Sequence, residues 1–387
     1  MQRKTVFVAT LVILAILMTA CAPAAAPSPT PAPPPPTAKP VGAAPTPTTA
    51  AASAPKPAGA APTPTTAAAP ATKPAPQAIK IGVTGTASDA GLYIGKEKGY
   101  FSEQGLDADV AVFQSLADMI AAMSKGDLDV GGGGWTVPIP NAIQRGIPIK
   151  VVADKGSTPP GFSFLQVTVR KDLYDSGQIK EPAQLKGKKI GVSSVASMAV
   201  MLGPLLEQAK LTVKDVDMVP LAWADMLAGY ANKSLDAAII SEPTLTKAIE
   251  DGLAVRWKPL SDFHPSPQWG LLVFSPKFGE NTDAANRFMV AYLKAIRDYN
   301  DAFVKNKGKK EIVDILAKST AVKDVALYDK MAMPGLNPDG YVDKKGLAWG
   351  LQFWLSSGDM KETIDIEKVV DNRYVDAALQ KLGKYSR

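Results

Sequence analysis

The chain has 387 residues, enough for two compact lobes, and a formal net charge of +6 that includes its basic N-terminal end. Its one cysteine, Cys21, excludes an intramolecular disulfide, and its one histidine, His264, excludes a multi-histidine metal site. The densest basic run, Lys305 to Lys310, fits a solvated helix end, so nothing in the composition indicates a nucleic-acid partner.

The N-terminal 20 residues have the pattern of an export signal. Arg3 and Lys4 precede an apolar stretch that ends at Met18, and Thr19-Ala20-Cys21 follows. This ending resembles the lipobox of bacterial lipoproteins, with Met18 where the motif usually has leucine. The resemblance implies cleavage of a signal peptide, residues 1–20, and a lipid anchor on Cys21 that holds the protein on the extracytoplasmic face of the cell membrane. An exported chain with an unmodified cysteine is the alternative.

Residues 21–78 form the next segment, which is rich in Ala, Pro and Thr. Residues 22–78 contain no acidic and no aromatic residue, and the stretch GAAPTPTTAAA occurs at 42–52 and again at 59–69. Such a composition cannot bury a core, so we predict a disordered linker that tethers the folded part to the membrane.

From Ile79 onward, short apolar strands alternate with amphipathic helices, which is typical of a parallel α/β sheet. The pattern predicts strands at 79–83, 109–113, 128–131, 149–153, 165–170, 189–192, 217–220 and 237–240, and helices at 91–97, 116–125, 282–305, 309–318 and 347–356. Ligands of open α/β sheets bind beyond the carboxyl ends of the strands, so the loops there are the candidate site.

These loops are rich in small residues, lead into helix N-termini and carry no Lys or Arg. Backbone N–H groups at such termini can donate to a ligand. The alternative is that Ser88, Asp89 and Ser115 only cap helices. The ligand-binding residues predicted from the loops and their neighbours are Thr86, Ser88, Asp89, Tyr93, Gln114, Ser115, Trp135, Ser194, Ser197, Trp223, Glu242 and Trp269.

Several blocks of the chain occur in an order known from one protein class. They are GLYIGKEKGYFSEQGLDADVAVF, SKGDLDVGGG, RGIPIKVVA, LKGKKIGVSSVAS and ADMLAGYANKSLDAAIISEPTLTKAIEDG. Over 79 to about 300 the chain resembles the nitrate/sulfonate/taurine and thiamine-precursor class of periplasmic solute-binding proteins. The resemblance implies a type II periplasmic-binding fold: two α/β lobes, a ligand cleft and two crossover strands.

Carried onto this chain, the resemblance assigns residues 79–165 and 271–387 to one lobe and 166–270 to the other. The hinge is expected near 165–169 and 270–274. A protein of this class passes a small ligand to the permease and ATPase subunits of an ABC importer and needs no cofactor. A sensor or adhesin that keeps the fold without transport is an alternative.

The same fold resembles the pyrimidine synthase of thiamine biosynthesis, whose chemistry depends on active-site His, Cys and iron. This chain has only His264, which we expect at a surface or hinge position, and Cys21, so a binding protein is favoured over an enzyme.

The aromatic residues near the loops suggest the class of ligand. Trp135 follows four glycines, a backbone too bare to form a packed surface, and this favours its exposure to the cleft. Together with Trp223, Trp269 and Tyr93, it favours a flat heteroaromatic nutrient such as riboflavin or a thiamine pyrimidine precursor. Asp89 and Glu242 are then expected to accept hydrogen bonds from ring N–H or amino groups. The alternative is an alkanesulfonate, taurine or nitrate held by helix N-termini.

Overall fold

The computed structural model describes residues 76–264 and 268–386. The predicted signal peptide, Cys21 and nearly all of the predicted linker lie outside the described residues. Within the described part, the strands form two five-stranded sheets. The first has the order β2 (Leu106–Val112), β1 (Gln77–Val83), β3 (Val130–Gly134), β10 (Gln268–Phe274), β4 (Lys150–Ser157). The second has the order β7 (Asp217–Pro220), β6 (Lys189–Val192), β8 (Ala237–Ser241), β5 (Leu165–Arg170), β9 (Ala254–Pro259).

Each sheet is mixed, whereas the strand pattern predicted parallel pairing. In the first sheet β1 pairs in parallel with β2 and β3, but β10 is antiparallel to β3 and β4. In the second sheet β6 is parallel to β7 and β8, but β5 is antiparallel to β8 and β9. β5 and β10 are the strands that the chain enters on arriving from the other sheet, so they run opposite to their neighbours.

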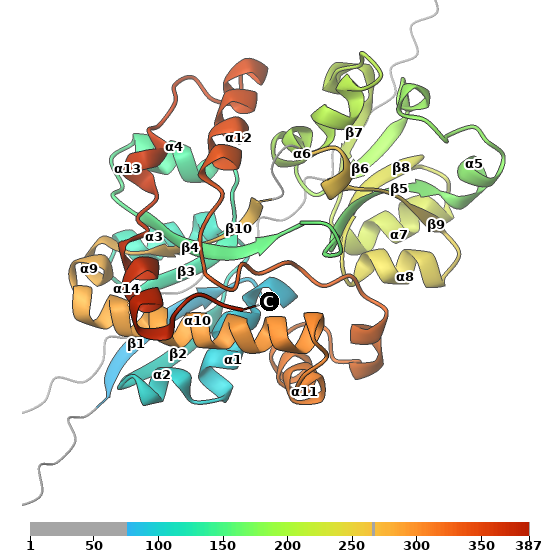
Figure 1. The fold of residues 1–387 in the computed structure, drawn as a ribbon. Coiled ribbons are helices and arrows are strands. Elements are labelled where there is room, and N and C mark those ends of the chain that lie inside the picture. The colour runs from blue at the N-terminus through green and yellow to red at the C-terminus, as the bar shows by residue number, and fades with distance from the viewer. Residues whose placement is uncertain (1–75, 265–267, 387) are drawn as a thin grey trace, which may run out of the picture. The chain divides into compact units, whose positions relative to one another are not determined.

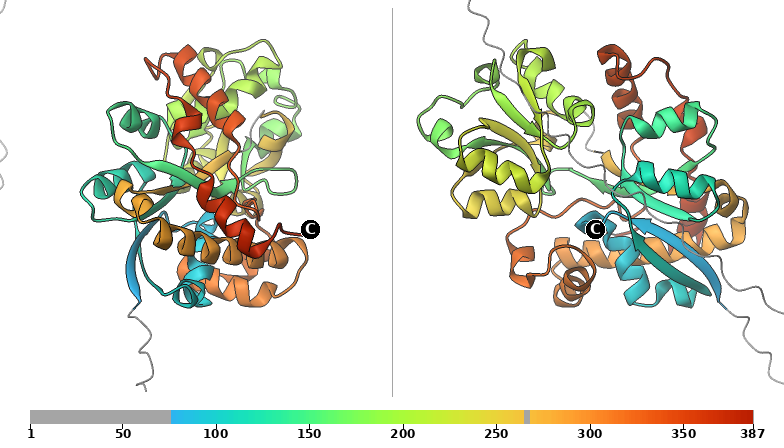
Figure 2. Two further views of the ribbon diagram at one scale, coloured as in Figure 1. Left: turned by 60° about the vertical axis from the view of Figure 1, so that its left-hand side comes forward. Right: turned by 180° about the vertical axis from the view of Figure 1, so that it is seen from behind.

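We call the first sheet with its helices lobe 1 and the second sheet with its helices lobe 2; both are visible in Figure 1. The chain leaves β4 at Ser157 and enters β5 at Leu165, and it leaves β9 at Pro259 and enters β10 at Gln268. The predicted hinge positions, 165–169 and 270–274, lie within the strands β5 and β10 that follow these connections. Seen from behind in Figure 2, the chain after β4 runs from one sheet to the other.

The described helices are α1 (Ala90–Glu97), α2 (Tyr100–Glu103), α3 (Leu116–Ser124), α4 (Pro138–Gln144), α5 (Lys171–Asp175), α6 (Val195–Glu207), α7 (Trp223–Ala231), α8 (Thr244–Glu250), α9 (Pro276–Glu280), α10 (Thr282–Val304), α11 (Lys309–Ser319), α12 (Lys344–Ser357), α13 (Ile366–Val369) and α14 (Arg373–Leu382). The five predicted helices are present as α1, α3, α10, α11 and α12, and the other described helices, among them the 13-residue α6, were not predicted.

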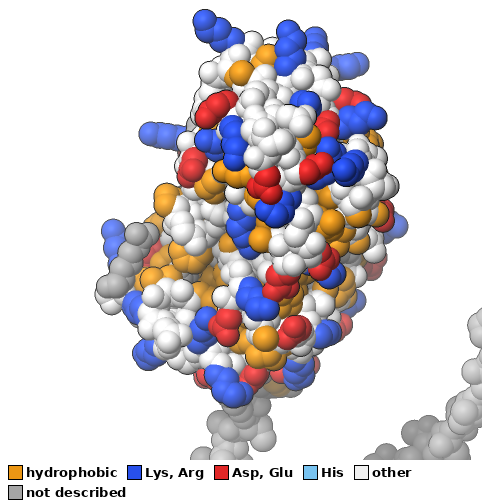
Figure 3. Space-filling model, turned by 90° about the vertical axis from the view of Figure 1, so that its right-hand side faces the viewer, with side chains coloured by type: hydrophobic (Ala, Val, Ile, Leu, Met, Phe, Trp, Pro, Cys, Tyr) orange, Lys and Arg blue, Asp and Glu red, His pale blue; other side chains and the backbone are white. Residues whose placement is uncertain are grey.

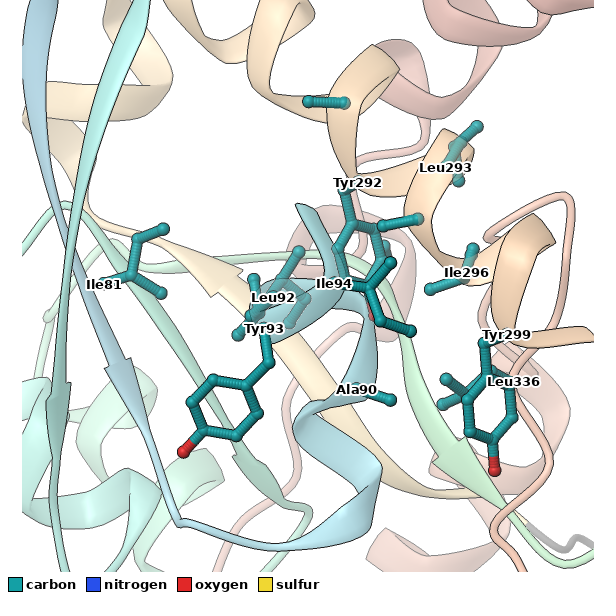
Figure 4. Close-up of a cluster of buried hydrophobic side chains, with 14 of the residues drawn as sticks. Ile81, Ala90, Leu92, Tyr93, Ile94, Tyr292, Leu293, Ile296, Tyr299 and Leu336 are labelled. Carbon is teal, nitrogen blue, oxygen red and sulfur yellow. The ribbon is translucent and has the colours of Figure 1, made fainter. Parts of the chain in front are cut away.

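The core of lobe 1 lies between the first sheet and the helix α10. Ile79, Ile81 and Val83 alternate along β1 and point to this side, as expected for a strand with period two. Figure 4 shows Ile81 with the α1 residues Leu92 and Ile94 and the α10 residue Tyr292 in one buried cluster. This packing holds the start of α1, and the loop before it, in a defined place.

α12 belongs to the C-terminal part of the chain but contacts lobe 2. The indole Nε1 of Trp354 donates to the Ala196 carbonyl of α6 at 3.2 Å, and a Cβ on Gly203 would lie 2.6 Å from the Phe353 ring. His264 is 9% exposed, contacts the Val200 carbonyl at 3.2 Å and packs edge-on against Trp349. The histidine is therefore buried in the connection between β9 and β10.

The surface carries charges of both signs. Figure 3 shows Lys and Arg side chains interspersed with Asp and Glu over one face. Many of these charges are paired, such as Lys98 with Asp298 at 2.7 Å and Lys309 with Asp329 at 2.7 Å.

Candidate functional site

A cleft of about 400 Å³ is lined by residues of both lobes. From lobe 1 and the C-terminal part of the chain it is lined by Thr84, Thr86, Ala87, Ser88, Gln114, Ser115, Leu116, Gly133, Gly134, Thr136, Lys155, Trp269, Gly270 and residues 331–334. From lobe 2 and the preceding connection it is lined by Phe164, Ser193, Trp223, Ser241 and Glu242. Most of these residues follow the carboxyl end of a strand, where open α/β sheets bind ligands.

The loop after β1 is held from beneath by Asp89. Its Oδ2 accepts hydrogen bonds from the backbone N–H of Thr84 at 3.1 Å and of Thr86 at 2.9 Å, and Asp89 is fully buried. Together with Thr86 it forms a capping box at the short helical turn that leads into α1. Asp89 thus shapes the loop that presents Thr86 and Ser88 to the cleft, and it does not line the cleft itself.

Lys155 is the cation of the cleft, and the loops did not reveal it because it comes from the middle of β4. Its side chain is 1% exposed, and its Nζ contacts Asp89 Oδ1 at 2.8 Å and Ser88 Oγ at 2.9 Å. An ammonium group has three N–H donors, so one remains without a partner among the described residues and is available to a ligand. The one sign of Lys155 in the sequence is that two charged residues, Asp154 and Lys155, occur together within an otherwise apolar strand.

The glycines of β3 leave room for side chains from other elements to pack directly against the strand backbone. A Cβ on Gly132 would lie 2.7 Å from Lys155 Cδ, one on Gly133 would lie 2.7 Å from Leu116 Cβ, and one on Gly134 would lie 3.1 Å from the Trp269 indole. The strand lacks side chains because Lys155, α3 and Trp269 occupy that space. Trp269 consequently lies flush with the strand and lines the cleft.

Trp135 lies outside the cleft lining, although the glycines before it favoured exposure. It is 4% exposed and packs against Trp354 of α12 with ring centroids 6.1 Å apart. The glycines suggested a strand without packed neighbours, whereas other side chains fill the space beside it. Trp135 connects β3 to α12 as a core residue.

Gln114 and Ser115 follow β2 and reach the cleft rim. Ser115 caps α3, with its Oγ accepting from Asp118 N at 3.3 Å and donating to the Asp118 carboxylate at 2.8 Å. Gln114 is exposed, and its side-chain amide makes no hydrogen bond within residues 76–264 and 268–386. Gln114 is therefore a polar group that a ligand can engage.

On the lobe 2 side, Trp223 is the first residue of α7, and Ser193 precedes α6. Both line the cleft. Ser194 is the N-cap residue of α6 and donates to Ser197 Oγ at 3.3 Å, and Ser197 is 5% exposed. Neither Ser194 nor Ser197 lines the cleft.

Glu242 lines the cleft, but its carboxylate is bonded to protein groups. Its Oε1 contacts Arg256 Nη2 at 3.0 Å and accepts from the Ala332 N–H at 3.1 Å, and its Oε2 accepts from the Thr246 N–H at 2.9 Å. Ala332 belongs to residues 331–334, which line the cleft from the C-terminal part of the chain. This segment has no strand or helix pattern, and sequence reasoning missed it.

Tyr93 lies in the core of lobe 1 and not in the cleft lining. It is 6% exposed and belongs to the buried cluster of Figure 4. Its hydroxyl has no hydrogen-bond partner among the described residues. Burial raises the pKa of this hydroxyl above its ordinary value, and the charge of Asp89 raises it further.

Asp154 is a second buried carboxylate of β4 and lies away from the cleft lining. It accepts hydrogen bonds from Gln268 Nε2 at 2.7 Å, Asn337 N at 2.7 Å and Gly156 N at 3.1 Å. Burial raises the pKa of Asp154 by more than the three donors and the charge of Lys155 lower it, so that the pKa lies at about 6, above its ordinary 3.8.

The structure thus brings together seven of the twelve predicted residues around one cleft and places five elsewhere. Those that line it are Thr86, Ser88, Gln114, Ser115, Trp223, Glu242 and Trp269. Those that do not are Asp89, Tyr93, Trp135, Ser194 and Ser197.

The described residues contain neither a helix that could cross a membrane nor a side-chain cluster that could hold a metal ion. No helix among them is both long and apolar enough to cross a membrane. No group of three or more His, Cys, Asp or Glu side chains within residues 76–264 and 268–386 is arranged to hold a metal ion.

Comparison with known proteins gives a family match and named relatives. The sequence model of the NMT1/THI5-like family matches residues 86–301. A protein of Brucella abortus (strain 2308), provisionally named a binding protein, is 29% identical over 232 residues, which are 58% of this chain and 66% of the relative, just under two thirds of its length. A protein of Bacillus subtilis (strain 168), provisionally named an aliphatic sulfonates-binding protein, is 26% identical over 317 residues, 78% of this chain and 88% of the relative.

Solved structures share the fold. The periplasmic aliphatic sulphonate binding protein SsuA from Escherichia coli has a TM-score of 0.62 at 20% identity, covering 77% of this chain and 92% of its own. The desulfurization enzyme DSZB has a TM-score of 0.54 at 16% identity, covering 79% of this chain and 99% of its own. The two-lobe α/β fold of the periplasmic binding proteins, expected from the sequence, is confirmed. Because an enzyme shares it, the fold alone does not assign a function.

Proposed function

The chain belongs to the NMT1/THI5-like family, and from that premise we propose that it is the extracytoplasmic substrate-binding protein of an ABC importer. In this role it captures a small nutrient between its lobes and delivers it to the permease and ATPase subunits. The binding-protein names of its relatives support the proposal, as does a cleft lined from both lobes. A sensor that uses the same cleft without transport is the alternative, and a neighbouring permease gene would favour transport.

The ligand we propose is a flat heteroaromatic nutrient of the riboflavin or thiamine-pyrimidine-precursor type. One observation carries this: indoles from both lobes, Trp269 and Trp223, line the same cleft. Aromatic rings stack on such faces, and Phe164 adds a third apolar ring to the lining. Thr86, Ser88, Gln114 and Ser115 supply hydroxyl and amide groups for the polar edges of the ligand.

Charge pairing in the cleft supports a ligand without strong net charge. Lys155 is paired with Asp89 at 2.8 Å, and Glu242 is paired with Arg256 at 3.0 Å. A charged ligand would have to compete with these partners. We therefore assign Asp89 to shaping the site through the loop after β1, and Glu242 to the cleft wall.

An alkanesulfonate, taurine or nitrate is the second candidate, supported by the remaining N–H of Lys155. The N-termini of α3, α6 and α7 follow strands β2, β6 and β7, and helix N-termini favour anions. The sulfonate-binding name of the Bacillus subtilis relative also supports this candidate.

The lack of a reactive cysteine supports binding over catalysis. The chain's one cysteine is Cys21, outside the described residues, and His264 is buried beside α6 and α12. No Cys or His is among the described residues that line the cleft, so this lining offers no Cys/His nucleophile pair. An activity that consumes a cleft ligand would overturn this assignment.

Residues 1–78 complete the proposal as a signal peptide, a lipid anchor at Cys21 and a linker. They place the binding lobes on the outer side of the cell membrane. Metabolic labelling with a fatty acid tests the anchor, and a wild-type protein that takes up no label would overturn it.

The ligand proposal is tested by titrating the protein with riboflavin, a thiamine pyrimidine precursor, taurine and nitrate. We expect Trp223→Ala and Trp269→Ala each to weaken binding of the heteroaromatic ligand by about tenfold or more, because each removes a stacking face. The matched control is Trp257→Ala, since Trp257 is partly exposed in lobe 2 and lies outside the cleft lining. Tight binding of taurine or nitrate that both replacements leave unchanged would establish the anion candidate instead.

A further inference from the structure

A second cavity of about 540 Å³ lies beside the connection between β4 and β5. Three stretches of chain form its walls: residues 157–162, the end of α10, and residues 335–338. It shares no lining residue with the ligand cleft. Its volume lies within the range of small-molecule sites, about 300–1,000 Å³.

We call this second cavity the hinge cavity. Backbone hydrogen bonds hold its walls in place. Ser157 and Gly335 exchange two backbone hydrogen bonds of 2.9 Å each, and a Cβ on Gly335 would lie 2.6 Å from the Pro159 ring. Tyr299 donates to the Pro334 carbonyl at 2.6 Å and so fixes the third wall to α10. The cavity therefore does not depend on a flexible side chain.

The described residues that line the hinge cavity are all uncharged, and most are apolar. Pro159, Phe162, Leu336 and Val304 supply apolar surface, and Val304 is an exposed hydrophobic residue at 56%. An ion would find no counter-charge here, so the lining favours an uncharged and mainly apolar molecule.

Asn300 gives the cavity one directed polar group. It is 7% exposed, and its amide nitrogen donates to the Ile296 carbonyl at 2.7 Å and the Leu336 carbonyl at 2.9 Å. These two acceptors orient the amide, and its oxygen accepts no hydrogen bond from the described residues. That oxygen is not among the buried polar atoms that lack a partner, so it keeps accessible surface, and Asn300 is one of the residues that line the cavity.

We propose that the hinge cavity is a second binding site, for a small uncharged molecule that buries an apolar body against Phe162 and Leu336 and donates one hydrogen bond to Asn300 Oδ1. A donor on the ligand satisfies a polar atom that the described residues leave without a hydrogen bond. The proposal is independent of the ligand in the cleft.

Benzyl alcohol and benzyl methyl ether are the probes, because both carry one ring and one oxygen and only the alcohol donates. Their dissociation constants are measured by ligand-observed NMR on wild type, Val304→Trp and Val325→Trp. Val304→Trp fills the cavity from an exposed position, and Val325→Trp adds the same ring at a 47% exposed valine that does not line it. Pro160→Trp, also at an exposed lining residue, replaces Val304→Trp if that variant does not fold.

Saturable binding of the alcohol by wild type and Val325→Trp, weakened at least tenfold by Val304→Trp, is expected. The ether is expected to bind at least about threefold more weakly than the alcohol, since it leaves Asn300 Oδ1 without a donor. Absence of saturable binding, equal affinity of the two tryptophan variants, or equal affinity for alcohol and ether would each overturn the proposal.

Discussion

In lobe 1 the Asp89 carboxylate contacts Lys155 of the same lobe, and both side chains are almost fully buried. In lobe 2 the Glu242 carboxylate contacts Arg256, whose side chain is 32% exposed, and it also accepts from the Ala332 N–H of the C-terminal part of the chain. The first pair is internal to one lobe. The second carboxylate joins two parts of the cleft wall, one from lobe 2 and one from the C-terminal part of the chain.

This difference separates two tasks that carboxylates perform beside the cleft. Asp89 fixes the shape of one loop and positions Lys155, so it belongs to the rigid part of the site. Glu242 holds residues 331–334 against lobe 2, so its bonds must break or move if the lobes separate. Opening and closing of the lobes around a ligand would therefore change the hydrogen bonds of Glu242 more than those of Asp89.

Asp154 is a third case, because the described hydrogen bonds to its buried carboxylate come from neutral groups. The donors are Gln268 Nε2 and the N–H groups of Asn337 and Gly156. Burial outweighs these donors and the charge of Lys155, and the pKa of Asp154 rises to about 6. The three carboxylates can be tested one by one.

The largest effect is expected from Lys155→Met, which leaves the Asp89 carboxylate buried without its cation. Breaking one side of a buried pair costs about 3–5 kcal/mol, and we expect a loss of that size in the free energy of unfolding by urea denaturation. Adding Asp89→Asn should restore part of the loss, because the uncompensated charge is removed. A single variant as stable as wild type would show that the pair does not hold lobe 1 together.

A pH-dependent effect is expected from Asp154. Its folded-state pKa lies above the unfolded value, so the folded protein binds more protons between pH 4 and 6, and the contribution of Asp154 to stability falls as pH rises through this range. The full difference corresponds to about 3 kcal/mol. Urea denaturation at several pH values should show wild type losing stability relative to Asp154→Asn from pH 4 to pH 7. Parallel curves for the two proteins would contradict the raised pKa.

A smaller effect is expected from Glu242→Gln, which removes one acceptor and the charge facing Arg256. Leaving a buried donor unsatisfied costs about 1–3 kcal/mol, and we expect a loss in this range together with faster hydrogen exchange at the Ala332 amide. The control is Lys330→Met, which removes the neighbouring contact to Glu250. Both of those partners are largely exposed and screened by solvent, so little change is expected. Equal rates of hydrogen exchange at the Ala332 amide in wild type and Glu242→Gln would show that Glu242 does not hold residues 331–334 against lobe 2.

Much of the fold could be predicted from local pattern. The strands at 165–170, 189–192 and 217–220 and the helices at 282–305 and 309–318 lie within one residue of the observed bounds. Their hydrophobic periodicity and capping residues act over a few neighbours, and both are visible in the sequence. The antiparallel direction of β5 and β10 was not visible, because strand direction depends on where the chain returns from.

The candidate site was predicted only where it consists of loops after strands. Thr86, Ser88, Gln114, Ser115 and Trp223 follow strand ends, and the structure places them around the cleft. Lys155 and residues 331–334 come from a strand interior and from an irregular segment, and they have no local signature. For Asp89 the sequence left both helix capping and ligand binding possible. Its capping hydrogen bonds are formed within residues 84–89, whereas its contact with Lys155 joins residues 66 positions apart in the chain.

By itself, the sequence determined the class of fold, the order of most strands and of five helices, and the loops from which much of the cleft is built, because these follow from periodicity and from residues close in the chain. The tertiary structure alone decided which aromatic side chains reach the cleft. Trp135 and Trp269 both lie beside the glycine strand, but α12 covers Trp135, whereas Trp269 rests on Gly134 and stays at the cleft. That outcome depends on a helix more than 200 residues further along the chain, and contacts over such separations leave no periodic trace in the sequence.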